Sequence, residues 1–485
     1  APINDLNDTY VNFDGITYAK GASVLKQLVY YVGREKFFQG INQYLNKYAY
    51  SNATLADLLH ELEKASGRDL KAWSAKWLEE SGINTIATEV EENADGTIAS
   101  LTLNQTAPAE HSVLRPHRLA VGFYDEDPAT GKIVRTDRFE LDVDGESTVV
   151  AAAAGKKRPA FILVNDDDLT YTKLRFDADS LSFALANLQR FDDALARAVV
   201  WLSLWDMTRD GDLAAEKFID TTLALLATET ESTTFRYALS CMSTTAWHYT
   251  APDRRADVVK HIAKELWKLV IAAPGGSDQQ FQLVTAYLGY GEEGDAEFAE
   301  HAQGLFDGSL IVAGLEIDNN FTWTIINALS SVKLIDQAGI DAQLAKRDTT
   351  ENREFALGAH AVRGDAAAKE WAWNEALNNA DLTNMQLEAV ARGFGATPRP
   401  DLAEPYAAKY YDVVDWVWKN KSFHMAEALL EGLYPYYADP ATLVELGHRW
   451  LADHEDADNA LKRIVRGNVE SSQRTLKVRD FNAAL

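Results

Sequence analysis

The spacing of apolar residues changes twice along this 485-residue chain. Residues 1–82 show the three- to four-residue spacing of amphipathic helices, whereas residues 83–166 show short alternating runs typical of half-buried strands. From residue 167 onward the helical spacing returns and continues to the C-terminus. Helices and strands bury their apolar surfaces in different layers, so one uniform architecture cannot accommodate all three regions. The sequence therefore predicts a multidomain α+β protein with domains 1–82, 83–166 and 167–485.

The first domain is predicted to be a helical bundle. Its first helix should run from Tyr18 to near Gly33, and its third should begin with Thr54 and Asp57 in the spacing of a capping box. The buried positions expected from the spacing are Ala22, Leu25, Leu28, Val29 and Val32, then Leu55, Leu58, Leu59 and Leu62, and finally Trp73 and Trp77. A bundle of about 80 residues has a small core, and its aromatic stripes exceed what that core can cover. We therefore expect part of the bundle to dock against another surface.

Residues 83–166 are predicted to form a small β-sandwich of about seven strands. Apolar residues alternate in five short runs, and turn signals lie between them at 93–96 and 127–131. Residues 165–169 look like a linker that leaves this domain. The remaining chain, 167–485, alternates helical segments with short polar, glycine or proline breaks at intervals of about 30–45 residues, which predicts an irregular α-solenoid of helix pairs.

Charge and composition restrict the partners and the compartment. The chain carries 73 acidic and 47 basic residues, a formal net charge of −26, and such a surface repels phosphate backbones and anionic lipid. We therefore expect no nucleic-acid partner and, because no uncharged apolar stretch approaches about 18 residues, no membrane span. Cys241 is the single cysteine, so no disulfide can form within the chain, which fits a reducing cytoplasm. We expect Cys241 to be a small buried residue rather than a nucleophile.

The ten histidines contain no recognisable metal-binding motif. A zinc helix of the H-E-x-x-H type needs two imidazoles four residues apart. The run that starts at His60 begins with a His-Glu pair but carries Lys64 in place of the second histidine, and we interpret it as a solvated helix surface. Gly393 and Gly395 follow a helix and lack a third glycine, so we expect a helix end rather than a dinucleotide site. The sequence predicts no tight metal site in this chain.

Tyr18 is the candidate catalytic residue, at the junction between an irregular lead-in and the first helix. A phenol in the first turn of a helix lies near the positive end of the helix dipole and can project from a rigid element into a cleft. A hydrogen-bond donor held in this way can stabilise an oxyanion. In the alternative interpretation the ring of Tyr18 packs inside the bundle. Lys20 is interpreted as a surface charge rather than a catalyst.

The segment 14–23, which contains Tyr18-Ala-Lys-Gly-Ala, resembles the Tyr-x-Lys-Gly-Ala segment of the aminopeptidase N family of zinc metallopeptidases, the gluzincin aminopeptidases. In that family the tyrosine donates a hydrogen bond to the oxyanion of the tetrahedral intermediate, and the resemblance implies this role for Tyr18. Further segments resemble the closing helices of the family's thermolysin-like catalytic domain, its β-sandwich, especially in actinobacterial members, and the entry to its C-terminal helical domain: 33–38, 55–59 and 66–78, then 114–119, then 163–171.

The resemblance implies a zinc-dependent aminopeptidase that removes N-terminal residues from peptides. The family's zinc helix and its G-x-M-E-N exopeptidase motif have no counterpart in this sequence, so the zinc ligands are expected to lie outside this chain. We therefore expect a C-terminal fragment of a cytoplasmic metallopeptidase, inactive by itself, with the missing N-terminal half as a partner and peptides as substrates. Thr322 stands where a family Asp-x-x-x-Arg-Trp pattern has arginine, so the resemblance does not imply a substrate contact from that helix.

A non-enzymatic interaction protein is the alternative, in which the concave face of the solenoid binds peptides or partner proteins. The two hypotheses differ in what they require of residues 1–82. A stand-alone scaffold should cover the apolar surface of its bundle, whereas a fragment should expose an apolar flank there.

Overall fold

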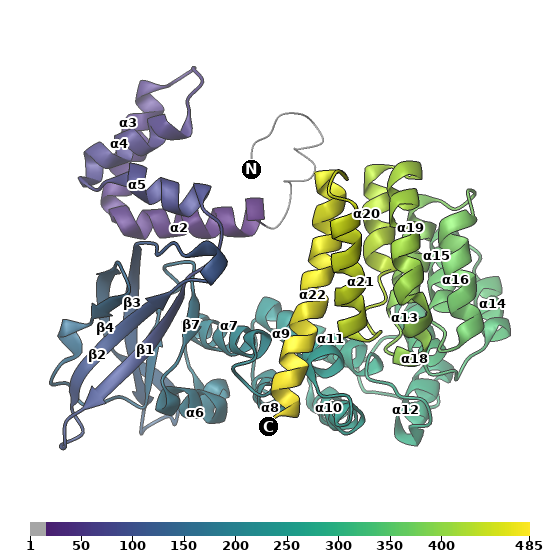
Figure 1. The fold of residues 1–485 in the computed structure, drawn as a ribbon. Coiled ribbons are helices and arrows are strands. Elements are labelled where there is room, and N and C mark those ends of the chain that lie inside the picture. Colours follow the sequence, from purple (N-terminus) through teal and green to yellow (C-terminus); the bar gives the residue numbers. More distant parts are fainter. Residues whose placement is uncertain (1–15) are drawn as a thin grey trace. The chain divides into compact units, whose positions relative to one another are not determined.

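The structure, a computed structural model, describes residues 16–485, with side chains from Tyr18 onward. The chain divides into two compact units, and the boundary between them lies between Met207 and Thr208. Within the described residues, the first unit contains helices and strands and the second contains helices (Figure 1). The prediction of a mixed α+β chain with a large helical C-terminal region is confirmed. None of the described helices combines the length and the apolar composition needed to cross a bilayer.

The described part of the first unit begins with a small helical bundle. Its elements are the π-helical turn η1 (Ile16–Lys20), α2 (Gly21–Val32), α3 (Arg34–Lys47), α4 (Leu55–Ser66), α5 (Leu70–Ser74) and the π-helical turn η2 (Ala75–Glu79). Gly33, with a φ of 86°, ends α2 as the sequence predicts. The predicted capping box is confirmed at the start of α4, where the side chains of Thr54 and Asp57 each accept from the other's backbone N–H.

Apolar contacts hold this bundle together. The core comprises Val24, Leu28, Val32, Leu59, Leu62, Leu70, Trp73 and Trp77. Three predicted core positions are wrong, because Ala22, Leu25 and Leu55 are exposed. Leu25 lies about 100° around the helix from Val24, so the two side chains cannot both point to the centre of the core. Leu55 is the first residue of α4.

Seven strands form two sheets in the described part of the first unit. The four-stranded sheet has the order β5-β2-β1-β7, with bounds Ser147–Val149, Ile98–Thr106, Thr85–Glu92 and Lys173–Arg175. The three-stranded sheet has the order β4-β3-β6, with bounds Ile133–Val143, His117–Glu126 and Phe161–Val164. All neighbouring strands are antiparallel except β1 and β7. The packing of the two sheets as a sandwich stays a prediction.

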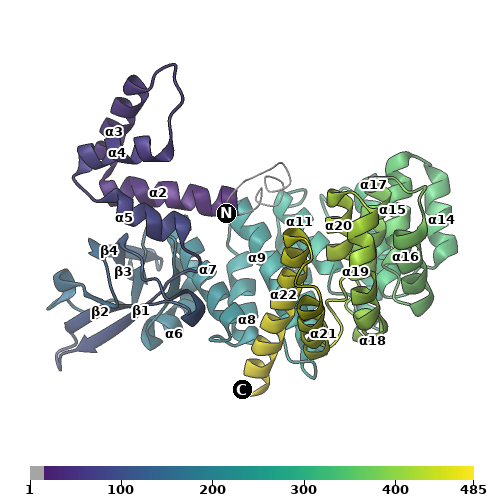
Figure 2. The same ribbon diagram turned by 45° about the horizontal axis from the view of Figure 1, so that its top comes forward.

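The linker predicted at 165–169 is wrong. The chain returns to the four-stranded sheet as β7 after this segment, and Asn165 and Asp166 within it are buried. Helix α2 contacts β3, and Figure 2 shows this helix lying across one end of the strands. The domain boundaries at residues 82 and 166 stay predictions.

Helices make up most of the remaining chain. Those that follow the strands are α6 (Ala178–Asn187), α7 (Ala194–Asp210), α8 (Ala215–Leu226), α9 (Ser232–Thr244), η6 (Thr245–Tyr249), α10 (Arg255–Ala272), α11 (Asp278–Leu288), α12 (Ala296–Asp307), α13 (Asn319–Ser331), α14 (Gln337–Lys346), α15 (Thr350–Ala361), α16 (Ala366–Asn378), α17 (Asn384–Gly395), α18 (Pro400–Ala403), α19 (Ala407–Asn420), α20 (Phe423–Gly432), α21 (Pro440–Asp453) and α22 (Asn459–Ala483). Short 3₁₀ turns are η3 (Ala109–His111), η4 (Ala151–Ala153), η5 (Leu188–Arg190) and η7 (Glu404–Tyr406).

Alternate helices of the second unit contact one another. The pairs include α9 with α11, α11 with α13, α13 with α15, and α15 with α17. Contacts of this kind are typical of stacked helix pairs, although the solenoid architecture stays a prediction. Cys241 in α9 is 3% exposed, which confirms that it is a small buried residue.

Candidate functional site

Tyr18 lies in η1, the π-helical turn that leads directly into α2. The sequence predicted the first turn of an α-helix, and the structure has the wider π-helical turn instead. Turns of this type are rare and occur frequently at functional sites. The side chain of Tyr18 is 59% exposed, so its ring is not enclosed in the bundle. A phenol exposed to this extent can reach a group outside the helices that carry it.

Lys20, two residues from the candidate tyrosine, is partly buried rather than a fully exposed surface charge. Burial, and then the positive charge of Arg115, lowers the pKa of Lys20. Arg115 is itself 1% exposed, and its guanidinium donates to the carbonyl oxygens of Lys76 at 2.9 Å, Glu80 at 2.9 Å and Ser81 at 2.7 Å. A cation suits the carbonyl end of a helix. Arg115 therefore joins the end of the bundle to the segment that precedes β3.

His117, the first residue of β3, is fully buried. Its Nδ1 lies 2.7 Å from the hydroxyl of Thr170, and its Nε2 lies 2.8 Å from Oε1 of Gln105. The imidazole packs edge-on against Trp77, with 5.1 Å between ring centroids. Burial, and then the positive charge of Arg115, lowers the pKa of His117 to about 3. The ring is therefore neutral near pH 7 and serves as a structural hydrogen-bonding group.

The lowered pKa of His117 predicts a loss of stability in mild acid. The unfolded chain binds the proton near pH 6.5 and the folded chain only near pH 3, so between these values the unfolded state holds more protons and the free energy of unfolding falls as the pH falls. From pH 7 to pH 5 the titration of His117 should lower the free energy of unfolding by about 2 kcal/mol. Urea unfolding of the wild type and of His117→Gln at both pH values measures the effect, because the variant lacks the titrating ring. An equal pH dependence in the two proteins would contradict it.

We name residues 165–171, between β6 and β7, the clamp loop. Three of its residues, Asn165, Asp167 and Asp168, have left-handed φ values of 59°, 66° and 54°. This conformation costs about 1 kcal/mol or more for each residue with a Cβ, and short polar side chains tolerate it best. The Asn-Asp-Asp-Asp run is therefore the sequence signal that could have indicated a left-handed turn in place of a linker.

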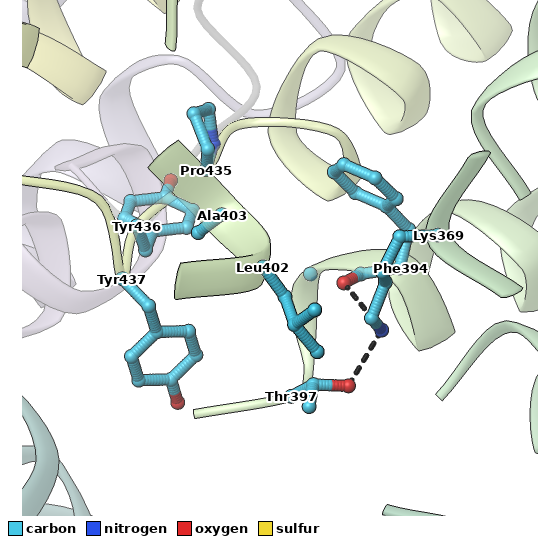
Figure 3. A pocket seen from close by; sticks show the side chains of 9 residues that line it. Lys369, Phe394, Thr397, Leu402, Ala403, Pro435, Tyr436 and Tyr437 are labelled. Atoms are coloured by element: carbon cyan, nitrogen blue, oxygen red, sulfur yellow. Dashed lines mark hydrogen bonds between the residues drawn. The ribbon is translucent and has the colours of Figure 1, made fainter. Parts of the chain in front are cut away.

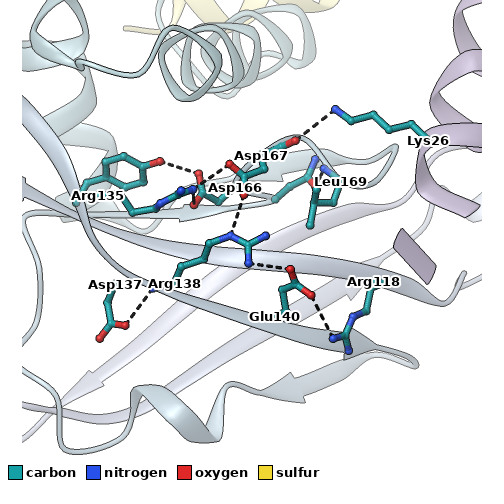
Figure 4. Close-up of polar contacts among 11 residues, drawn as sticks. Lys26, Arg118, Arg135, Asp137, Arg138, Glu140, Asp166, Asp167 and Leu169 are labelled. Carbon is teal, nitrogen blue, oxygen red and sulfur yellow. Dashed lines mark hydrogen bonds and ion pairs between the residues drawn. The ribbon is translucent and has the colours of Figure 1, made fainter. Parts of the chain in front are cut away.

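Asp166 attaches the clamp loop to the three-stranded sheet. Its carboxylate is fully buried and accepts hydrogen bonds from the hydroxyl of Tyr124 at 2.6 Å and from Arg135 at 2.8 Å (Figure 4). Gly122 of β3 permits this approach, since a Cβ at that position would lie 2.5 Å from an oxygen of Asp166. No local pattern in the sequence could have indicated this partly buried ion pair, because its partners lie far apart along the chain.

The interpretation of the run that starts at His60 as a solvated helix surface is wrong. This helix surface is not fully solvated, because Glu61 is 4% exposed and pairs with Lys47 at 2.7 Å and with Lys64 at 3.1 Å. Hydrogen bonds from Lys47 and then Lys64 lower the pKa of Glu61. Across residues 16–485, no three His, Cys, Asp or Glu side chains are grouped so that they could hold a metal ion. The described residues therefore do not fit a zinc centre.

A buried lysine in the second unit has a structural role. Lys369 of α16 is 3% exposed, and its side-chain nitrogen donates to the carbonyl oxygens of Ala361, Gly393 and Phe394 and to the hydroxyl of Thr397, all within 3.2 Å. Figure 3 shows the bonds to Phe394 and Thr397. These acceptors lie at or near the C-terminal ends of α15 and α17, where helices leave carbonyls unpaired. The prediction that the glycines there mark a helix end is confirmed. The adjacent cavity measures only about 10 Å³, which is room for about one water molecule.

Comparison with known families decides where the chain belongs. The ERAP1-like C-terminal domain matches residues 161–474, and the Peptidase family M1 domain matches residues 1–77. The chain belongs to the M1 family of aminopeptidases. Among M1 relatives, "Aminopeptidase N" of Streptomyces lividans is 39% identical over 490 residues, which cover 100% of this chain and 57% of that protein. The resemblance carried by the segment around Tyr18 is thereby confirmed at the level of the family.

Other M1 relatives match shorter stretches. "Aminopeptidase 2, mitochondrial" of Saccharomyces cerevisiae is 30% identical over 195 residues, which cover 37% of this chain and 19% of that protein. "Probable aminopeptidase 2" of Sulfurisphaera tokodaii is 42% identical over 78 residues, which cover 16% of this chain and 10% of that protein. The chain thus spans 57% of the length of its Streptomyces relative and smaller shares of these two.

Proposed function

We propose that this chain is the C-terminal part of a zinc-dependent aminopeptidase that removes N-terminal residues from peptides, and that it is inactive by itself. In this proposal Tyr18 donates a hydrogen bond to the oxyanion that forms when the scissile carbonyl is attacked. The observation that carries the proposal is the set of large apolar side chains that the helical bundle leaves exposed, among them the Tyr18 ring.

These exposed apolar side chains all lie in the first part of the chain. Each is at least 46% exposed, and the set comprises Tyr18, Leu25, Phe38, Leu45, Tyr50, Leu55 and Leu78. A scaffold that functions alone should cover such side chains, since exposed apolar surface favours association. Their exposure therefore favours the fragment hypothesis and supports an upstream part of the same protein as the partner that covers them.

The contribution of this chain to the reaction is a hydrogen-bond donor on a firmly attached helix. The zinc ligands are assigned to sequence outside this chain, because the described residues do not fit a metal centre and the sequence lacks an H-E-x-x-H motif. The net charge of −26 attracts the cationic α-amino group of a peptide. The single cysteine supports a cytoplasmic location for the complete enzyme.

A peptide- or protein-binding scaffold is the second candidate, and a groove between α9 and α11 favours it. The groove has a volume of about 500 Å³, and its lining includes Arg236, Leu239 and Phe281. Concave apolar surfaces with a few polar groups are typical of ligand sites. Both proposals allow peptide binding at this groove, so turnover, and not binding, separates them.

The chain alone, supplied with zinc, is expected to show no turnover of aminoacyl arylamides. The same chain joined to its upstream part should release arylamine, lose this activity to a chelator and regain it with zinc, because a metal centre must be complete to bind its ion. Release of arylamine, followed by absorbance, measures both proteins. Reproducible turnover by the chain alone contradicts the fragment proposal, and absence of turnover in the joined protein favours the scaffold.

A further inference from the structure

We propose that Gln27 is a positioning residue for Tyr18, and that the clamp loop fixes helix α2 so that the Tyr18 phenol is held in place. This inference rests on the proposed oxyanion role of Tyr18 and adds the group that keeps the donor in position. Gln27 needs no contact with a substrate, because it acts through the helix that carries Tyr18.

Gln27 binds the clamp loop from a completely buried position. The side chain is 0% exposed, and its Oε1 accepts two hydrogen bonds, from the hydroxyl of Thr170 at 2.6 Å and from the backbone N–H of Tyr171 at 3.0 Å. Its Nε2 is buried without a hydrogen-bond partner among the residues the structure describes. An unpaired buried donor is costly, so the value of glutamine at this position lies in the two bonds that its carbonyl accepts.

Lys26 makes a second connection between α2 and the clamp loop. Its ammonium donates to the carboxylate of Asp168 at 3.0 Å and to the carbonyl oxygen of Asp167 at 3.3 Å (Figure 4). The side chains of Lys26 and Asp168 are 39% and 48% exposed, and an ion pair between exposed groups contributes little free energy alone. Together with the buried bonds of Gln27, however, it attaches two adjacent residues of α2 to one loop.

The clamp loop is in turn anchored to the strands. Arg135 and Arg138 of β4 donate to the carboxylate of Asp167 at 2.9 Å and 2.8 Å. Partial burial by itself raises the pKa of Asp167, but the two arginines lower it overall, so the carboxylate stays ionised. Thr170, which binds Gln27, also lies 2.7 Å from Nδ1 of the buried His117. The clamp loop therefore keeps its left-handed backbone because it is bound both to α2 and to the strands.

The distance along the helix explains why this attachment matters for Tyr18. Gln27 lies nine positions after Tyr18, which corresponds to about 13 Å of helix. A tilt of about 5° at the clamp loop would move the start of the helix by about 1 Å. A displacement of about 1 Å at a reacting group can cost about 100-fold in rate. An oxyanion donor has to be in place before the charge develops, so the attachment of α2 determines how well Tyr18 can work.

The test uses the enzyme in which this chain is joined to its upstream part. Gln27→Met, which keeps the length of the side chain and removes its acceptor, should lower kcat by about 10- to 100-fold and change KM by less than about twofold. In a Tyr18→Phe background the same substitution should lower kcat no further, because the hydroxyl that it misplaces is already absent. Gln303→Met, at an exposed position of α12, is the matched control and should leave kcat unchanged.

Non-additivity is the readout that a purely structural role would not produce. If Gln27→Met lowers kcat equally with and without the Tyr18 hydroxyl, the inference is overturned while the oxyanion role stands. If Tyr18→Phe alone leaves kcat unchanged, the proposed function of Tyr18 is overturned and the inference with it. Thr170→Val, which removes one of the two hydrogen bonds to Gln27, is a milder second variant and should show the same non-additivity with a smaller loss.

Amide hydrogen exchange tests the clamp in the chain as it stands, without any assay of activity. Gln27→Met should speed exchange in α2 by about tenfold or more, because the helix loses its buried attachment, while α4 of the same bundle should change much less. Unchanged exchange in α2 would show that the clamp loop does not hold this helix.

Discussion

Replacing Tyr18 by phenylalanine in the joined enzyme is expected to lower kcat by about 10²- to 10³-fold, the usual cost of one oxyanion donor. The substitution removes a single hydroxyl and keeps the ring. KM should change little, because the oxyanion exists only in the transition state and the intermediate that follows it. Initial rates over a range of peptide or arylamide concentrations separate the two parameters.

Tyr30→Phe is the matched control for this experiment. Tyr30 lies on the same helix, α2, and its substitution also removes one phenolic hydroxyl. It should change kcat by less than about twofold, since no role in the reaction is assigned to it. Thermal unfolding of the wild type and of Tyr18→Phe separates a loss of kcat from a loss of stability. A loss in kcat below about tenfold for Tyr18→Phe would contradict the oxyanion role.

Lys369→Met is expected to lower the free energy of unfolding by about 3 kcal/mol or more. The substitution keeps a long side chain in the buried site but removes the donor shared by three carbonyl oxygens and the hydroxyl of Thr397. Carbonyls left unpaired in a buried site cost their full desolvation penalty. Urea unfolding followed by circular dichroism measures the loss.

Lys264→Met, at an exposed position of α10, is the matched control and should change stability by less than about 0.5 kcal/mol.

The pH dependence of the free energy of unfolding offers a second readout. Burial lowers the pKa of Lys369 from 10.5 to about 7, so between these values the unfolded chain keeps a proton that the folded chain releases, and the free energy of unfolding rises with pH. From pH 7.5 to pH 9 this rise amounts to about 2 kcal/mol at most, and it should be absent in Lys369→Met. A loss of stability below about 1 kcal/mol in the variant would contradict the structural role.

Local features of the fold could be predicted from the sequence because they depend on residues a few positions apart. The capping box of Thr54 and Asp57, the helix end at Gly33, and the pair of Trp73 and Trp77 are all confirmed. The change from helical to alternating spacing likewise indicated where the strands lie, since each spacing reflects the geometry of one kind of element.

The buried face of α2 could not be predicted from the spacing of apolar residues. Leu25 was expected in the core and is 56% exposed, whereas the polar Gln27 is fully buried. The reason is a partner 143 residues away, since the hydroxyl of Thr170 binds the Gln27 carbonyl. Glu61 was misjudged in the same way, because its burial depends on pairing with Lys47 of another helix.

The sequence by itself determined the family, the order of helical and strand regions, and Tyr18 as the candidate site, because a short motif and local spacing carry that information. Only the tertiary structure decided that the Tyr18 ring is exposed, and that residues 165–171 form a left-handed loop bound to α2. The physical reason is that burial and hydrogen bonding in these places join groups far apart along the chain, and no local pattern specifies which of them meet.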